Sequence, residues 1–428
     1  MNILLVGSGG REHALAWKMA QSHHCDNLFI APGNPGTASI GTNVDIQVND
    51  FVGLRNCVLE NAIDMIVVGP EDPLVNGIYD YFLNDEATQH VNVIGPSAEA
   101  AQLEGSKAYS KHFMQRHAIP TASYAEFTHA NYEQGIDYIK VHTLPIVLKA
   151  DGLAAGKGVI IAFTHQEALT SFEEMIQNKQ FGEASSKVVI EQFLEGIEVS
   201  VFALTDGFNY QIIGHAKDYK RIGEGDTGLN TGGMGCVSPV PFMDETFMKK
   251  VEDRIILPTI KGLQAENLVY KGFVFFGLMN CGGEPYVIEY NCRLGDPETE
   301  VILPRLQTDL VSLLAAADNG TLQDVNIEYH PASFATVMAV SGGYPGDYQK
   351  GFPIEGLAQA ATVPGALVFQ AGTGFDGDTI VTKGGRVLTT TAQGNNLQDA
   401  VDNAQKALSH IHFEGMYFRK DIGYEFKS

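Results

Sequence analysis

Three polar residues at alternate positions, Glu289, Asn291 and Arg293, could bind a metal ion and a phosphate. They begin within an apolar stretch, residues 286–290, that is typical of a strand. In a strand, residues two apart point to the same face. A carboxylate and an amide oxygen side by side are hard ligands that suit Mg²⁺ or Mn²⁺ held against substrate phosphates, and an arginine beside them can pair with a carboxylate or phosphate. The alternative is an ordinary strand-end ion pair between Glu289 and Arg293.

A lysine near the end of another predicted strand, Lys149 in residues 146–150, precedes a glycine-rich loop over residues 152–158 that includes Lys157. The loop is not a P-loop, because it has three residues between its glycines and a glycine after its lysine, where that motif needs four residues and a serine or threonine. Strands are expected on both sides, so the segment is a hairpin cap that can close over nucleotide phosphates, which a lysine contacts as a point charge. A surface hairpin with a solvated lysine is the alternative.

Two acidic residues seven positions apart, Glu191 and Glu198, flank an apolar turn between predicted strands. A carboxylate beside such a turn suits the amino group of a purine, and the second carboxylate can accept hydrogen bonds from ribose hydroxyls. The alternative to a nucleoside site is that both residues are ordinary exposed glutamates in a turn.

The end of the first predicted strand carries Gly9, Gly10 and Arg11 and leads into a helix. Bare backbone N–H groups and the positive end of a helix favour an anion there. A dinucleotide loop is disfavoured, because Glu12 stands at the third glycine of GxGxxG and residues 31–34, after the second strand, hold no acid for a ribose. A phosphate or sugar-phosphate site is therefore favoured over a nicotinamide-dependent dehydrogenase, and a structural turn without ligand remains the alternative.

The order of strand and helix patterns along the chain predicts a multidomain α/β and α+β protein, with domains at residues 1–102, 103–325 and 326–428. Strands and helices alternate in the first domain, which indicates a doubly wound parallel sheet. The last domain reads as small and β-rich with one amphipathic helix. Strands are predicted at residues 2–6, 28–31, 65–68, 91–94, 146–150, 158–162, 188–191, 199–204, 273–279, 286–290, 334–340, 366–370 and 386–392. Helices are predicted at residues 12–21, 106–117, 306–318 and 397–411, and a long loop at 223–235.

Composition narrows the class of protein. The net charge of −23 disfavours nucleic acid and anionic membranes as partners. No apolar run approaches the roughly 20 residues of a membrane helix, and the N-terminus reads as a strand rather than a signal peptide. The five cysteines include no CxxC pair, which favours the cytoplasm over a disulfide framework or zinc site.

Taken in order, these segments resemble the phosphoribosylamine–glycine ligase family (glycinamide ribonucleotide synthetases) of ATP-grasp enzymes. The matching stretches are GSGGREHALAWK, APGNPGTA, VVGPEDPLV, GPSAEAAQLEGSKA, LKADGLAAGKGV, DTGLNTGGMG, EYNCRLGDPETE, SGGYPGDY and FRKDIG. The resemblance implies a doubly wound N-terminal domain, a central ATP-grasp fold and a C-terminal domain. It also implies the reaction: ATP phosphorylates glycine to an acyl phosphate, and 5-phosphoribosylamine attacks it, giving glycinamide ribonucleotide, ADP and phosphate in purine biosynthesis.

The resemblance also implies roles for individual residues. Arg293 and the loop residue Lys157 are the expected catalytic residues. Lys107 and Lys149 are expected at the ATP phosphates; Glu191, Phe193 and Leu194 at adenine; Glu198 at ribose; Glu289 and Asn291 at Mg²⁺ or Mn²⁺; Gly9, Gly10 and Arg11 at phosphoribosylamine; and Asp296 at the substrates.

The chain departs from the family pattern at a few positions. The segment that usually reads QDHKR is residues 217–221 here, with Tyr219 in place of histidine, and Leu229 replaces the proline of DTGPN. Leu294 and Glu300 replace the common phenylalanine and glutamine of RFGDPETQ. We expect an active enzyme, because none of these changes removes a named ligand.

Some alternatives stay open. Residues 273–279 hold no acid, so either fewer protein ligands hold the metal or Glu298 contributes. Another ATP-grasp ligase with a different carboxylate or amine, and a nucleotide-binding regulatory protein without turnover, are the remaining functional alternatives.

Overall fold

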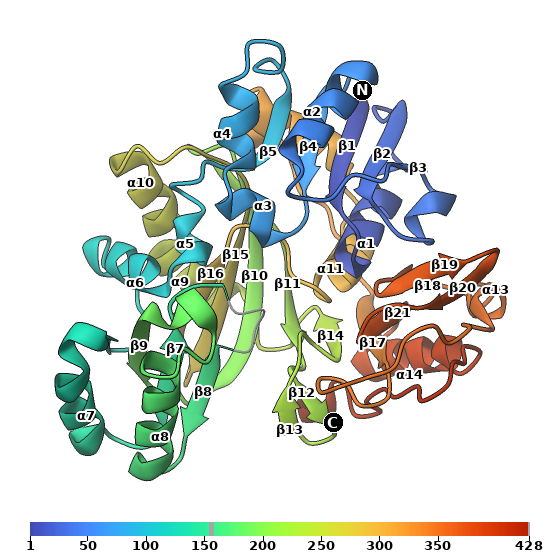
Figure 1. Cartoon of the computed structure of the whole chain (residues 1–428). Helices are drawn as coiled ribbons and strands as arrows, with labels where there is room; N and C mark the ends of the chain where they lie inside the picture. Colours follow the sequence, from blue (N-terminus) through green and yellow to red (C-terminus); the bar gives the residue numbers. More distant parts are fainter. Residues whose placement is uncertain (154–157, 427–428) are drawn as a thin grey trace.

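A computed structural model describes residues 1–153 and 158–426 of the chain. Within them, thirteen strands form one continuous sheet in the order β18–β21–β17–β14–β11–β10–β15–β5–β4–β1–β2–β3, with β16 paired to β15. The N-terminal region lies at the top of Figure 1, a separate four-stranded sheet at the lower left, and the C-terminal region at the lower right. No helix in the described part of the chain is long and apolar enough to cross a membrane.

The N-terminal region is a parallel sheet with helices on both faces, as predicted. Alternate residues of β1 face opposite sides, so Ile3 and Leu5 join the core under α1 while Leu4 and Val6 join the core under α2 and α4. The strands are β1 (Asn2–Gly7), β2 (Asn27–Pro32), β3 (Thr42–Asn43), β4 (Met65–Val68) and β5 (Asn92–Pro96). The helices are α1 (Gly10–Met19), α2 (Phe51–Glu60), α3 (Glu71–Val75) and α4 (Ile78–Leu83).

The central region continues the same sheet, because β15 pairs antiparallel with β5 through Tyr270 and Pro96. This edge-to-edge contact fixes the N-terminal region relative to the rest of the molecule. The strands are β10 (Ile197–Thr205), β11 (Tyr210–Asp218), β12 (Arg221–Gly223), β13 (Thr227–Asn230), β14 (Gly235–Ser238), β15 (Tyr270–Cys281) and β16 (Glu284–Asn291). The helices are α5 (Gln102–Gly105), α6 (Lys107–Arg116), α9 (Glu245–Val251), α10 (Leu257–Ala265), α11 (Thr299–Arg305) and α12 (Leu310–Asp318).

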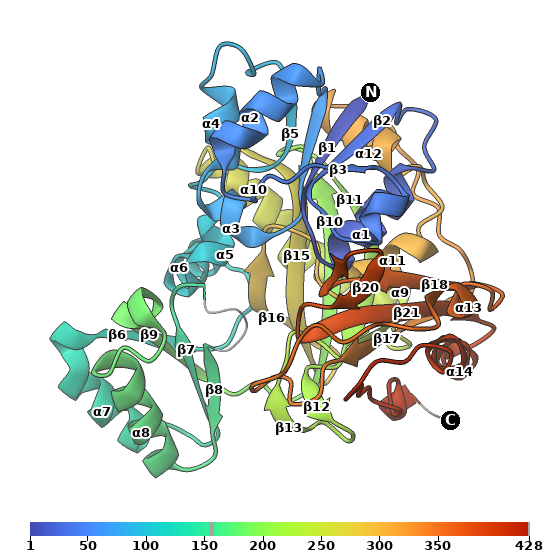
Figure 2. The ribbon, with the colours of Figure 1, turned by 45° about the vertical axis from the view of Figure 1, so that its right-hand side comes forward.

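The four-stranded sheet is antiparallel, in the order β6–β9–β7–β8, and packs against α7 and α8. Its small core contains Phe127, Leu148, Phe172 and Ile190. Figure 2 shows this unit standing away from the large sheet, connected by extended segments. Its elements are β6 (Tyr124–Thr128), α7 (Tyr132–Val141), β7 (Ile146–Ala150), β8 (Val159–Ala162), α8 (His165–Ile176) and β9 (Lys187–Gln192).

The C-terminal region is small and β-rich, as predicted, and its strand β17 pairs with β14 of the central region. Helix α14 covers the sheet through Val401, Ala404 and Leu408. The elements are β17 (Ser333–Val340), α13 (Leu357–Ala360), β18 (Ala366–Gln370), β19 (Thr373–Asp376), β20 (Thr379–Thr382), β21 (Arg386–Gly394) and α14 (Leu397–Leu408).

Two local predictions were wrong. The helix expected at residues 306–318 begins only at Leu310, because Asp309 caps it by accepting a hydrogen bond from the backbone of Ser312 and Leu306 forms a β-bridge with Tyr329. The loop expected at 223–235 contains part of the β12–β13 hairpin and the start of β14.

Candidate active site

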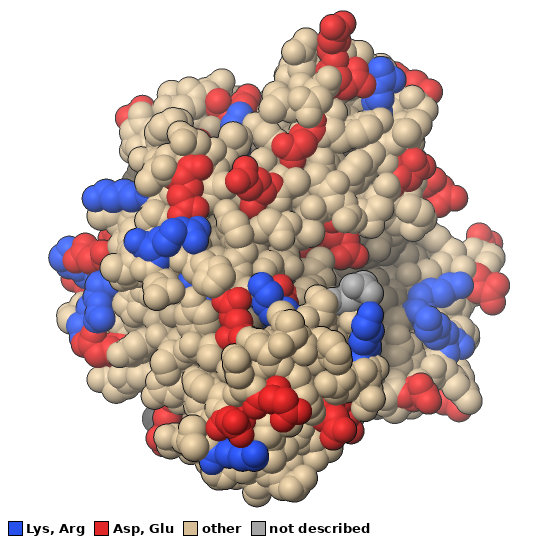
Figure 3. Space-filling view, turned by 60° about the vertical axis from the view of Figure 1, so that its left-hand side comes forward, with Lys and Arg blue, Asp and Glu red and all other residues tan. Residues whose placement is uncertain are grey.

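A cavity of about 830 Å³ lies between the four-stranded sheet and the large sheet and extends toward the N- and C-terminal regions. In Figure 3 acidic side chains are spread over the visible face, and a hollow opens toward the right of the view. Lys157 lies outside the described residues, and Gly9 and Gly10 do not line the cavity. The other predicted site residues do: Arg11, Lys107, Lys149, Glu191, Phe193, Leu194, Glu198, Glu289, Asn291, Arg293 and Asp296.

A β-bulge in β16 turns Glu289 toward this cavity. Gly277 pairs with Glu289 whereas Leu278 pairs with Val287, so one extra residue, Ile288, interrupts the register. In consequence Val287 and Tyr290, three positions apart, both face the core. Without the bulge, Glu289 would share the core face with Val287. Which side of the sheet Glu289 and Asn291 face therefore depends on this irregularity.

Lysines from β7, from α6 and from the segment after β11 surround Glu289. Lys149 belongs to β7, and Lys107 is the first residue of α6, whose N-cap is Ser106. Burial alone would raise the pKa of Glu289, but the charges of Lys220, Lys149 and Lys107 outweigh it and lower that pKa. The carboxylate is therefore ionised and lies among positive charges.

Glu191 is buried between two lysines. Its Oε1 lies 3.0 Å from Lys149 Nζ and its Oε2 lies 3.1 Å from Lys111 Nζ. Burial lowers the pKa of Lys111 to about 8. Lys111 was not predicted from the sequence. The one feature that could have indicated it is its place on the buried face of the predicted helix 106–117.

The neighbouring part of the cavity combines apolar side chains with a charged pair. Phe193 and Leu194 lie in the turn after β9 and line the cavity together with Met279. Glu198 forms an ion pair with Lys220, a second residue that sequence reasoning missed. Burial raises the pKa of Glu198, and the same pair raises that of Lys220. This part of the cavity therefore offers apolar surface beside a charged pair.

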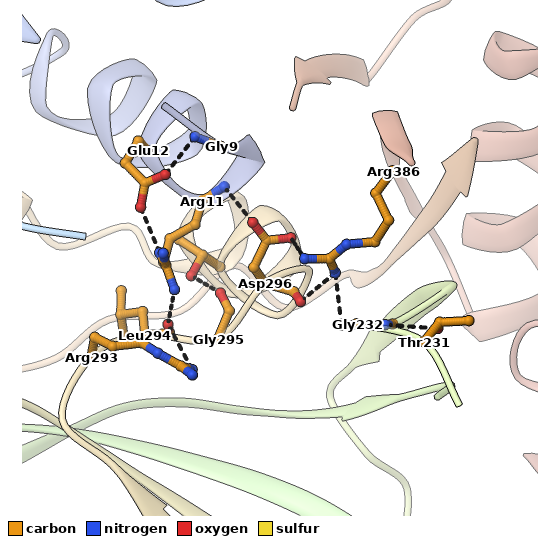
Figure 4. A network of polar contacts seen from close by, with 12 residues as sticks. Gly9, Arg11, Glu12, Thr231, Gly232, Arg293, Leu294, Gly295, Asp296 and Arg386 are labelled. Atoms are coloured by element: carbon orange, nitrogen blue, oxygen red, sulfur yellow. Dashed lines mark hydrogen bonds and ion pairs between the residues drawn. The ribbon is translucent and has the colours of Figure 1, made fainter. Parts of the chain in front are cut away.

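The opposite end of the cavity meets the start of α1 at Arg11. Figure 4 shows the polar contacts made there. Arg11 pairs with Glu12 at 2.6 Å and donates to the carbonyl oxygen of Leu294 at 3.2 Å. Its backbone N–H donates to Asp296 at 3.4 Å, and Arg386 of the C-terminal region pairs with the same carboxylate at 3.0 Å. Arg386 is a third residue that sequence reasoning missed, since nothing local links it to this motif.

Arg293 pairs with two acids from other elements. Its guanidinium lies 3.2 Å from Glu71 and 2.8 Å from Glu104, and it donates to Asn291 Oδ1 at 3.3 Å. Burial raises the pKa of Glu104 to about 7. The alternative of a strand-end ion pair between Glu289 and Arg293 is wrong, because Arg293 forms its ion pairs with Glu71 and Glu104.

Comparison with known proteins identifies the family. Phosphoribosylglycinamide synthetase models match along the chain: the N domain over residues 1–104, the ATP-grasp (A) domain over 105–299 and the C domain over 334–425. The phosphoribosylamine–glycine ligases of Chlorobaculum tepidum and Vibrio cholerae are each 47% identical over 427 residues, covering 99% of this chain and 99% and 98% of theirs. The chain belongs to the phosphoribosylglycinamide synthetase family.

Solved structures agree with this membership. The crystal structure of phosphoribosylamine–glycine ligase from Thermotoga maritima has a TM-score of 0.84 and 34% identity, covering 98% of this chain and all of that one (100%). A biotin carboxylase from Campylobacter jejuni has a TM-score of 0.72 at 15% identity, covering 99% and 94%, which shows the fold alone. The predicted family and the predicted fold class, with a central ATP-grasp domain, are confirmed.

The structure accounts for one departure from the family pattern. Tyr219 is buried, and its hydroxyl donates to Glu425 at 2.7 Å. Lys217 Nζ lies 4.1 Å and the guanidinium of Arg419 5.3 Å from the centre of its ring. Contacts of two cations with the π-system stabilise an aromatic ring at this position. A tyrosine in place of the synthetases' usual histidine therefore has a complete set of partners.

The other departures differ in environment. Leu229 lies exposed on β13, and Leu294 is buried in the apolar core. Glu300 is fully buried and neither of its oxygens has a hydrogen-bond partner. Burial, together with the charge of Asp296, raises the pKa of Glu300 well above its ordinary value.

Proposed function

We propose that this synthetase-family chain joins glycine to 5-phosphoribosylamine with ATP, forming glycinamide ribonucleotide, ADP and phosphate. One observation carries the proposal: an ionised Glu289 faces Lys107, Lys149 and Lys220 in a cavity whose far end is the helix start at Arg11. Curated relatives of nearly the same length carry the name of this ligase. Residues 1–102, 103–325 and 326–428 are the proposed domains.

Lys107 and Lys149 would stabilise the phosphoryl group as it passes from ATP to the glycine carboxylate. The transferring oxygens carry negative charge, and preorganised cations in a buried site lower the free energy of that transition state. The product is glycyl phosphate, whose carbonyl carbon is then attacked by the amine of phosphoribosylamine, with phosphate leaving. Lys157, outside the described residues, is proposed for the loop that covers the reacting groups.

Glu289 and Asn291 would hold Mg²⁺ or Mn²⁺. Their oxygens are the donor type that such ions prefer, and Glu289 is ionised. Among the described residues no three His, Cys, Asp or Glu side chains converge as a metal site, so the nucleotide phosphates would complete the coordination. When bound, the ion neutralises charge on the transferring phosphoryl group.

The nucleoside would occupy the part of the cavity near Phe193 and Leu194. These side chains offer apolar surface to adenine, and Glu198 offers oxygens to the ribose hydroxyls. Both oxygens of Glu191 are paired with lysines, so its contribution to the adenine site would come from the backbone of β9.

Phosphoribosylamine would bind at the start of α1. Gly9, Gly10 and Arg11 stand at this helix start, where the positive end of the helix favours an anion and Arg11 adds a positive charge. Asp296 lies at the same helix start and is held by Arg386. An acid at this position can accept a hydrogen bond from the attacking amine, and Arg293 next to it can pair with the glycine carboxylate. The five free cysteines among the described residues suit the cytoplasm as the place of action.

The test is ADP release by the purified protein with ATP, Mg²⁺, freshly generated phosphoribosylamine and glycine, each omitted in turn. Release that needs every component, with glycinamide ribonucleotide formed, supports the proposal. Release with another carboxylate in place of glycine would contradict the proposed substrate.

The role of Glu289 is tested separately with Glu289→Ala, which should abolish turnover and leave thermal unfolding nearly unchanged. Glu284→Ala is the matched control, because Glu284 lies on the same strand and pairs only at the surface with Lys250 and Arg254. A folded Glu289→Ala enzyme with near-normal turnover would remove Glu289 from the metal site.

A further inference from the structure

The bulge that turns Glu289 toward the cavity is held by two side-chain donors. Thr121 Oγ1 donates to the carbonyl oxygen of Val287 at 2.7 Å, and Lys149 Nζ donates to that of Ile288 at 3.2 Å. Val287 and Ile288 are the residues at which the register of β16 shifts. A bulge leaves ladder groups without strand partners. Here the two carbonyls are bound by the side chains of Thr121, whose backbone also forms a β-bridge with Val287, and of Lys149 from the four-stranded sheet.

A single buried lysine connects these donors. Lys111 Nζ donates to Thr121 Oγ1 at 2.7 Å and forms an ion pair with Glu191 at 3.1 Å, while Glu191 pairs with Lys149 at 3.0 Å. A threonine hydroxyl has one proton to donate. Because Lys111 occupies an acceptor position on that hydroxyl, the proton is directed to Val287. The Lys111 side chain is 2% exposed, so water does not compete for these contacts.

We infer that Lys111 and Thr121 are positioning residues that fix the β16 bulge and thereby aim Glu289 at the metal. The inference rests on the proposed function, in which Glu289 is a metal ligand. Two chains of contacts connect Lys111 to neighbouring carbonyls of the bulge. One runs through Thr121 to Val287, and the other runs through Glu191 and Lys149 to Ile288. Loss of Lys111 frees the Thr121 hydroxyl to rotate and leaves Glu191 to draw Lys149 away from Ile288.

The experiment compares Lys111→Met and Thr121→Val with the wild type. Thr121→Val keeps the shape of the side chain and removes only the hydroxyl, so it tests the inference if Lys111→Met fails to fold. Mn²⁺ binding is measured from the loss of the free-ion EPR signal in the presence of a non-hydrolysable ATP analogue. Binding of the same analogue is also measured in EDTA. We expect the Kd for Mn²⁺ to rise about 10- to 100-fold in both variants, the effect typical of residues that orient metal ligands. In Thr121→Val, which leaves the Lys111–Glu191–Lys149 ion pairs in place, metal-free nucleotide binding should change less than about 3-fold.

Lys18→Met is the matched control, because Lys18 is also a buried lysine whose Nζ donates to a backbone carbonyl, that of Leu306, and it does not line the cavity. Its thermal unfolding should shift while its Mn²⁺ Kd stays at the wild-type value. Lys111→Arg should recover part of the Mn²⁺ affinity, because arginine can still donate to Thr121 and pair with Glu191.

Three outcomes are distinguishable. Weakened Mn²⁺ binding in Lys111→Met and Thr121→Val but not in Lys18→Met supports the inference. Wild-type Mn²⁺ binding in Thr121→Val, with binding lost in Glu289→Gln, overturns the inference and leaves the proposed function intact. Wild-type Mn²⁺ binding in Glu289→Gln overturns the proposed metal site itself.

Discussion

His13 Nδ1 accepts a hydrogen bond from the backbone N–H of Gln370 at 2.8 Å, which joins α1 of the N-terminal region to β18 of the C-terminal region. The His13 imidazole is buried and packs edge-on against Phe369. Only the neutral ring can accept this hydrogen bond. This hydrogen bond between the N- and C-terminal regions therefore depends on the protonation state of one histidine.

The free energy of unfolding should fall as the pH falls from about 6.5 to about 4. Burial lowers the pKa of His13 from 6.5 to about 4, so in this window the unfolded chain binds a proton that the folded chain does not, and the contribution is fully present above pH 6.5. The shift corresponds to about 3 kcal/mol. Urea unfolding at a series of pH values measures it.

His13→Asn should reduce this pH dependence, because asparagine keeps an acceptor near the position of Nδ1 and does not titrate. Part of the dependence of the unfolding free energy on pH should remain, since burial also lowers the pKa of His215 to about 4. The exposed His129 is the control, and His129→Asn should leave the slope unchanged. An unchanged slope in His13→Asn would contradict the assignment.

Glu300→Gln should stabilise the protein at alkaline pH. The pKa of the buried Glu300 is raised in the folded protein. Below the ordinary pKa of about 4.3 the carboxyl group is protonated in both the folded and the unfolded chain and costs no stability. As the pH rises from there toward the folded-state pKa, the unfolded chain loses this proton first, and the free energy of unfolding falls. An amide removes this loss. We expect a gain of about 2 kcal/mol at pH 8, disappearing near pH 4. Glu328→Gln, at an exposed position, should show no gain at either pH.

Arg419→Met should destabilise the protein by about 3–5 kcal/mol, because it leaves two acids without their cation. Arg419 is 0% exposed and pairs with Asp226 at 2.6 Å and Asp421 at 2.8 Å, which ties the C-terminal segment to the β12–β13 hairpin. Arg116→Met removes a partly exposed pair with Glu266 and should cost no more than about 1 kcal/mol. Equal losses in the two variants, measured by urea unfolding, would argue against this role for Arg419.

Glu198→Gln should raise the KM for ATP about 10-fold and leave the KM for glycine within about 2-fold of the wild type, equivalent to about 1.4 kcal/mol of nucleotide binding. The change removes the charge that pairs with Lys220 and one acceptor for the ribose. Glu195→Gln is the matched control, since Glu195 is exposed in the same turn. A rise in the glycine KM without a rise in that of ATP would place Glu198 elsewhere in the site.

Local patterns in the sequence predicted most of the strands. The predicted strand at residues 65–68 coincides with β4 (Met65–Val68), and the one at 146–150 with β7 (Ile146–Ala150). A strand buried in a parallel sheet or a small core needs a short apolar run bounded by turn residues. Such a run consists of residues adjacent in the sequence, so it can be recognised without the structure. The nine motifs in family order likewise sufficed for the family.

The geometry of the site was decided by tertiary structure. The bulge at Ile288 is an irregularity of pairing with β15, so the spacing of Glu289 and Asn291 predicted a shared face but not the partners that fix it. Arg386 meets Asp296 across 90 residues of sequence, and Lys111 meets Glu191 across two elements. Residue type and spacing determine which chemistry the chain can perform. Which charges neutralise one another depends on long-range packing, because an ion pair forms only where the fold removes both groups from water together.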